Sequence, residues 1–165
     1  MRLESLLAVL LLSSTAFPIS RVGNNKVVTD RLNRFSSAIP SDFSDLTENR
    51  GGGATLASGV YMVNPSRPVE IQMMRFHSAF PQLAHKGLGE LEHYFLSETD
   101  AHYETVQGKT KGAVTLIGGG LQDLTGIAIC TDGLGVVIFA PDIEMTRTAM
   151  LEILKSTTFE KPCSK

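Results

Sequence analysis

The sequence predicts an α+β domain in which helices pack on an antiparallel β-sheet of about six strands. Two apolar, β-branched runs flank Asp132-Gly133, and such a turn between such runs is a strong hairpin signal. A segment of helical period follows this hairpin and begins at Pro141-Asp142. Further strand patterns earlier in the chain also come in pairs. The predicted order is α, β-β, α, β-β, β-β, α.

The composition indicates one globular domain and excludes some partners. The chain has 165 residues, of which 42% are hydrophobic and 19% charged, which is enough for one core. The formal net charge is −2, so the sequence offers no basic excess for nucleic acid. We therefore expect no nucleic-acid partner.

The N-terminus resembles a signal peptide. Residues 6–12 form an apolar run that is long enough for a signal core and too short to span a bilayer. Small residues at Ser14 and Ala16 predict cleavage after Ala16, so residues 1–16 are the signal peptide. The protein is then exported, periplasmic or secreted, without an integral membrane span after cleavage. The alternative is a buried N-terminal helix.

The two cysteines, Cys130 and Cys163, predict one disulfide in an oxidising compartment. After the turn, a strand of about six residues covers about 20 Å. A helix of about fourteen residues then returns by about 21 Å, which brings the tail back towards Cys130. The alternative is a buried free Cys130 and a loose Cys163.

The N-terminal third predicts a helix and a linker. Four apolar residues follow the spacing i, i+4, i+7, i+11 of one helix face: Val28, Leu32, Phe35 and Ile39. Pro40 ends this helix, residues 41–50 read as a solvated loop, and the triglycine 51–53 reads as a hinge. We assign residues 17–53 to the N-terminal helix and Gly-rich linker, and residues 54–165 to the α+β domain.

The α+β domain begins with a predicted hairpin. In its second strand Val69, Ile71 and Met73 face one way, and the residues between and after them, Glu70, Gln72 and Met74, face the other. The elements are, in order, strands 55–64 and 69–76, a helix 81–97, strands 103–108 and 112–117, the Thr125 hairpin, and a final helix with Asp142 as its N-cap.

The Thr125 hairpin, which begins at Thr125 and turns at Asp132-Gly133, is apolar on both faces, and this makes it the candidate interface. A strand that is buried on one face alone would alternate apolar and polar residues. We expect the hairpin to be central in the sheet, or its second face to be covered by another element or by another chain. The N-terminal helix is the candidate cover within the chain, and a partner protein or a second copy is the equal alternative. The candidate interface residues are Ile127, Ile129, Val136, Val137, Ile138 and Phe139.

Catalytic and ligand-binding motifs are missing from the sequence. A G-x-S-x-G elbow does not occur, and Asp123 stands where a dinucleotide fingerprint from Gly118 needs its third glycine. The histidines lack the spacing of a zinc motif and are expected on the surface: His77, His85, His93 and His102. We predict no catalytic residues, no cofactor and no metal.

The second half resembles the Mog1/PsbP-like α/β sandwich superfamily, over residues 56–159. The resemblance rests on a small V-x-G turn in Thr105-Val106-Gln107-Gly108, followed by a strand, a hairpin and a final helix. That helix closes with a Ser-x-x-Phe motif, Ser156 to Phe159. The resemblance implies a non-catalytic binding or assembly-accessory domain and supplies no catalytic residues.

Two functional hypotheses follow. In the first, the protein is an exported, non-enzymatic binding or assembly-accessory domain whose partner is another envelope or secreted protein, or a second copy in a homodimer. In the second, it is a small exported enzyme of the hydrolase type with an unrecognised site.

Overall fold

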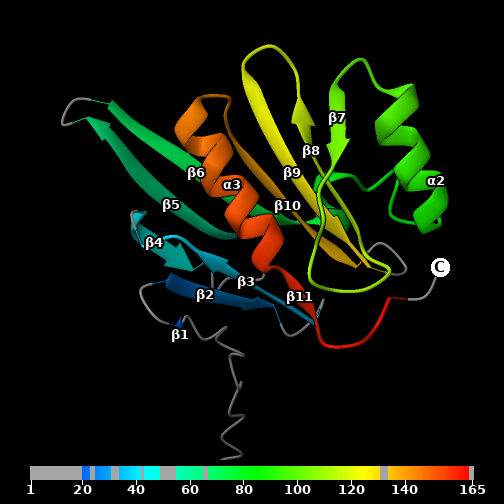
Figure 1. Cartoon of the computed structure of the whole chain (residues 1–165), viewed down its shortest axis with the longest axis horizontal. Helices are drawn as coiled ribbons and strands as arrows, with labels where there is room; N and C mark the ends of the chain where they lie inside the picture. The colour runs from blue at the N-terminus through cyan, green and yellow to red at the C-terminus, as the bar shows by residue number, and fades with distance from the viewer. Residues whose placement is uncertain are drawn as a thin grey trace, which may run out of the picture.

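The computed structural model describes residues 20–22, 25–30, 34–41, 43–48, 55–64, 67–130 and 134–163. These residues form two β-sheets and a small number of helices (Figure 1). The elements in chain order are β1 (Ser20–Val22), β2 (Asn25–Asp30), β3 (Phe35–Ile39), β4 (Ser44–Glu48), β5 (Thr55–Asn64), β6 (Arg67–Arg75), α1 (Phe76–Ala79), α2 (Leu88–His93), the π-helical turn η1 (Tyr94–Glu98), β7 (His102–Thr105), β8 (Val114–Gly119), β9 (Asp123–Ile129), β10 (Gly135–Pro141), α3 (Glu144–Ser156) and β11 (Thr158–Phe159).

The larger sheet has the strand order β4-β5-β6-β10-β9-β8-β7, and the smaller sheet has the order β1-β2-β3-β11. Every pair of neighbouring strands is antiparallel. The predicted fold class, α+β on an antiparallel sheet, is confirmed. The β9–β10 hairpin lies in the middle of the larger sheet, as its two apolar faces predict.

The predicted N-terminal helix over residues 28–39 is wrong, because this segment forms β2 and β3. In β3 the buried residues are Phe35, Ser37 and Ile39, which is the period of a strand. Because Ser37 is polar, the alternation of this strand does not appear in the hydropathy pattern. The apolar residues alone have the spacing of a helix face. The loop expected after Pro40 contains β4, and the triglycine 51–53 lies outside the described residues.

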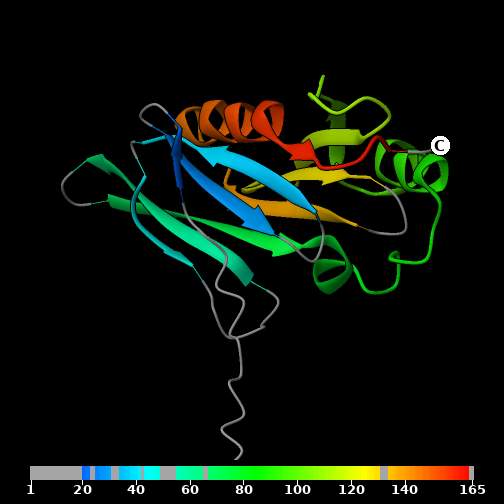
Figure 2. The same cartoon turned by 90° about the horizontal axis from the view of Figure 1, so that it is seen from below.

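Two hydrophobic cores lie on opposite faces of the larger sheet. One core joins Val136 and Ile138 of β10 to α3 and to Val28 and Phe35 of the smaller sheet. The other joins Val137 of β10 to apolar side chains of α1 and α2. Figure 2 shows α3 on one side of the sheet strands and α1 on the other.

The candidate interface is therefore covered within the chain. Its members Ile127, Ile129, Val136, Val137 and Ile138 are each 0% exposed. Phe139 remains partly exposed. An exposed interface made of all six side chains is ruled out, because a central hairpin needs a cover on both faces and both covers are present. The N-terminal segment contributes to one cover, as strands rather than as a helix.

The helix expected over residues 81–97 begins later and is shorter. Residues 81–86 form turns, and α2 begins at Leu88 and continues into η1. Gly87 precedes α2, and its N–H donates to Oε2 of Glu90 at 3.0 Å. A residue with weak helix propensity thus marks the start of the helix.

The final helix, α3, begins at Glu144, two residues after the expected cap. Ile143 is the N-cap residue, and its N–H donates to the Thr146 hydroxyl at 3.2 Å. The Thr146 hydroxyl also contacts the carbonyl of Pro141. Asp142 instead accepts from the guanidinium of Arg147. A short segment between β10 and α3 is thus fixed by side-chain hydrogen bonds.

The C-terminal segment connects distant parts of the chain. Cys130 and Cys163 form a disulfide with their Cα atoms 5.0 Å apart, and β11 pairs with β3. Disulfides of this kind belong to proteins of oxidising compartments. Within the described residues, no helix is both long and apolar enough to cross a membrane.

A buried ion pair links the two sheets. Asp30 ends β2 of the smaller sheet, and Arg75 ends β6 of the larger one. The Arg75 Nε donates to Oδ2 of Asp30 at 3.0 Å, and both side chains are almost fully buried. Buried charges need such partners, because removing them from water is costly.

Candidate functional site

A hollow of about 420 Å³ opens on the face of the larger sheet that also carries α1 and α2. We call it the sheet hollow. Its lining comes from β6, β9 and β10: Glu70, Gln72, Asp123, Thr125, Phe139, Ala140 and Pro141. On β6, Glu70 and Gln72 are exposed while Val69, Ile71 and Met73 are buried on the opposite face, as their alternation predicts.

Strand register aligns the floor of the sheet hollow. Phe139 of β10 lies opposite Gln72 of β6 on one side and opposite Thr125 of β9 on the other. Directly opposed residues in antiparallel strands share a face and contact each other. The row Gln72, Phe139, Thr125 is therefore a fixed feature of the sheet, with a partly exposed aromatic ring between two polar side chains.

The row continues towards β7. Thr125 lies opposite Gly118 of β8, and Gly118 lies opposite Tyr103 of β7. A Cβ atom on Gly118 would lie 2.1 Å from the His102 carbonyl oxygen, so the strands approach closely there. Because Gly118 has no side chain, Tyr103 reaches across β8 and hydrogen-bonds with Thr125.

Tyr103 forms the border between the sheet hollow and the covered part of this face. Its ring packs against Phe95 of η1 with centroids 5.2 Å apart. Burial raises the pKa of the Tyr103 phenol, the hydrogen bond with Thr125 lowers it, and the nearby Tyr94 raises it further. The net effect is a raised pKa, so Tyr103 is a neutral hydrogen-bonding group at ordinary pH.

The lining of the sheet hollow carries a negative charge. Among the described residues that line it, Glu70 and Asp123 are carboxylates and none is a cation. A ligand that combines an apolar group for Phe139 with a positive charge for the carboxylates complements this lining. The sequence had singled out Phe139, but it gave no signal for Asp123 or Thr125, which only the strand register brings to the same place.

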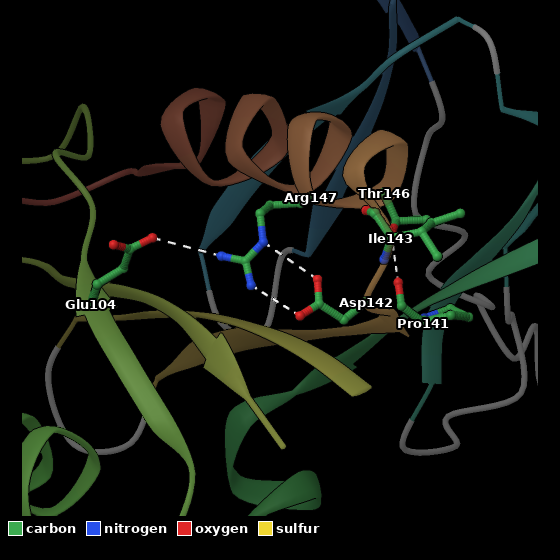
Figure 3. A network of polar contacts seen from close by, with 6 residues as sticks. All are labelled: Glu104, Pro141, Asp142, Ile143, Thr146 and Arg147. Carbon is green, nitrogen blue, oxygen red and sulfur yellow. Dashed lines mark hydrogen bonds and ion pairs between the residues drawn. The ribbon is translucent and has the colours of Figure 1, made fainter. Parts of the chain in front are cut away.

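A polar network lies at the start of α3 (Figure 3). Arg147 Nη2 is 3.0 Å from Oδ2 of Asp142, and Arg147 Nη1 is 3.7 Å from Oε1 of Glu104. Figure 3 shows the guanidinium between the two carboxylates, one from β7 and one from the segment before α3. The guanidinium is already paired with both carboxylates, so this network fixes the start of α3 rather than binding an anion.

The structure places the remaining candidate groups apart. All four histidines are exposed, as the sequence predicts, and His93 Nε2 is 3.4 Å from Oε1 of Glu98. In the described ranges, no group of three or more His, Cys, Asp and Glu residues is arranged to hold a metal ion. Cys130 is part of the disulfide and is therefore not a free thiol.

The comparisons with known proteins report fold alone. No protein-family model matches the chain, and no curated protein matches it. The solution structure of the cyanobacterial PsbP (CyanoP) of Synechocystis is similar over 84% of this chain and 94% of its own, with 8% identity and a TM-score of 0.42. This agrees with the PsbP-like resemblance of the sequence. A likeness of this size says nothing of ligands or partners.

Proposed function

We propose that this protein is exported and acts as a non-enzymatic accessory protein, which binds a segment of another envelope or secreted protein in the sheet hollow. The observation that carries the proposal is Phe139, an aromatic ring left partly exposed on an otherwise covered hairpin, with Glu70 and Asp123 beside it. Aromatic anchors with a polar rim are typical of protein interfaces.

Export is supported by two features. Residues 1–16 have the pattern of a signal peptide, and the Cys130–Cys163 disulfide fits an oxidising compartment. The partner segment inserts an apolar side chain over Phe139 and places a Lys or Arg near the carboxylates. Charge complementarity of this kind mainly sets specificity and the rate of association.

Photo-crosslinking in the organism that makes the protein tests the proposal. A photoreactive phenylalanine analogue at Gln72, inside the sheet hollow, should give an adduct with one other protein. The same analogue at His85, an exposed residue of the turns before α2, should not give that adduct. A Glu70→Lys change should abolish the adduct, whereas the matched Asp100→Lys change in the exposed loop before β7 should keep it.

Two outcomes would contradict the proposal. Equal adducts from Gln72 and His85 would mean that the sheet hollow has no specific partner. An adduct with the mass of two copies of this chain would instead assign the sheet hollow to a homodimer.

A further inference from the structure

A second groove lies on the opposite face of the molecule from the sheet hollow. Its volume is about 270 Å³, and its walls are the segment between β3 and β4 on one side and α3 on the other. We call it the α3 groove. Pro40 and Phe43 form the first wall, Met145 and Ala149 lie in the second, and Glu144 and Glu152 also line it.

The first wall is held in place by the backbone. Phe43 is 1% exposed, and its N–H donates to the carbonyl of Pro40 at 3.2 Å. The Lys26 ammonium donates to the carbonyl of Phe43 at 2.9 Å, so this cation is directed to the wall and not to the carboxylates of α3. A wall fixed before binding reduces the entropy that a ligand must lose.

The second wall is held to β3 at the far end of α3. The N–H of Ala38 donates to the Ser156 hydroxyl at 2.9 Å. The hydroxyls of Ser37 and Thr157 lie 2.7 Å apart in a buried hydrogen bond. At the near end Met145 is 40% exposed, which leaves a large flexible apolar side chain open to solvent beside Ala149.

The two carboxylates bracket this apolar wall. Glu144 and Glu152 are eight residues apart on α3, which corresponds to about 12 Å at 1.5 Å per residue. Both side chains are exposed. Among the described residues neither has a salt-bridge partner, whereas Arg147 on the other flank of α3 has two.

We propose that the α3 groove binds an extended segment of a partner protein with two basic residues four positions apart and an apolar residue midway between them. In an extended chain, residues i, i+2 and i+4 point to the same side and span about 13 Å. This spacing matches the separation of Glu144 and Glu152, with the apolar residue set against Met145 and Phe43. Because the α3 groove and the sheet hollow lie on opposite faces, the protein can hold two segments at once and so bridge two proteins.

Fluorescence anisotropy with two labelled peptides tests this inference on the purified chain. The first peptide carries Lys-Ser-Leu-Ser-Lys between glycines, and the second carries the same residues with the two lysines adjacent. We expect the spaced peptide to bind several-fold more tightly. Glu144→Gln combined with Glu152→Gln should weaken it about fivefold, the sum of two exposed ion pairs, and should remove its salt dependence.

Two further variants separate the charges from the apolar contact. Asp100→Asn removes an exposed carboxylate from the loop before β7 and should leave the affinity unchanged. Met145→Ala should weaken binding and keep its salt dependence, because Met145 contributes no charge. Each variant is checked by thermal melting, and the exposure of these side chains makes the fold insensitive to them.

The inference is overturned if both peptides bind equally, or if Asp100→Asn weakens binding as much as the double variant. It is also overturned if sedimentation shows a dimer that Ala149→Arg dissociates, since the occupant of the α3 groove would then be a second copy. None of these results changes the crosslinking expected at Gln72, so the sheet hollow is tested separately.

Discussion

Replacing Arg75 with Met should remove a large part of the stability of this protein. The guanidinium of Arg75 lies 3.0 Å from the carboxylate of Asp30, which is 0% exposed. Breaking a buried ion pair by removing one partner costs about 3–5 kcal/mol. The whole free energy of unfolding of a domain is about 5–15 kcal/mol. For a chain of this length we expect the melting temperature to fall by about 6–20 °C.

The loss in free energy of unfolding is measured by urea unfolding followed by far-ultraviolet circular dichroism, because the chain has no Trp for fluorescence. Arg147→Met is the matched control. Its ion pairs are exposed, so its cost should be about 1 kcal/mol or less. Combining Arg75→Met with Asp30→Asn should restore part of the loss, because the buried carboxylate is then neutral.

The reasoning fails if Arg75→Met costs no more than Arg147→Met. In that case apolar contacts alone stabilise the packing of the smaller sheet on the larger one. The ion pair then orients the two sheets but adds no measurable stability. A double variant as unstable as the sum of the two single variants would also contradict it, because Asp30 and Arg75 would then act independently.

Three further predictions concern the tail, the phenol and the N-terminus. Changing Cys130 and Cys163 to Ser should cost roughly 3–4 kcal/mol, since the cysteines are 33 residues apart, and thiol labelling of the native protein should find no free thiol. The raised pKa of Tyr103 contributes stability below about pH 10 that is lost as the pH rises through the folded-state pKa, so melting temperatures above that pH should fall less in Tyr103→Phe. The intact mass of the exported protein should correspond to a chain that begins at Phe17.

Local signals predicted the parts of the fold whose partners are close in sequence. The strand expected over residues 55–64 is β5, with the same bounds. The two strands expected on either side of Asp132-Gly133 are β9 and β10, which pair with each other from Ile129 and Gly135 onward. A turn signal between two apolar runs specifies such a local pairing in the sequence. The final helix was found from its period, and its N-cap lies one residue later than expected.

The N-terminal segment was mispredicted because its environment is set by the other end of the chain. Ser37 is buried as the partner of Thr157, and Ser36 and Phe35 pair with the two residues of β11. A buried serine carries no hydrophobic signal, and its hydroxyl partner is 120 residues away. A window of a dozen residues therefore sees four apolar positions at helical spacing and misses the strand.

The candidate site was predictable only in part for the same reason. Phe139 was visible in the sequence as one of a run of apolar residues, but five other members of that run are buried. Its exposure depends on where α1 and α2 stop covering the sheet. Asp123 and Thr125 join it through the pairing of β9 with β10, and Tyr103 joins through the missing side chain of Gly118.

The positions of the two surfaces follow from the central hairpin. Because β9 and β10 are apolar on both faces, the fold needs one cover on each face, and it makes them from unlike segments. A covering segment that is shorter than the sheet leaves an uncovered margin on that face of the sheet. On one face the margin is the sheet hollow around Phe139, and on the other it is the α3 groove, where α3 meets the segment after β3. Binding surfaces on this fold are therefore expected at the edges of its covers, and substitutions there should change binding while the central hairpin keeps the fold.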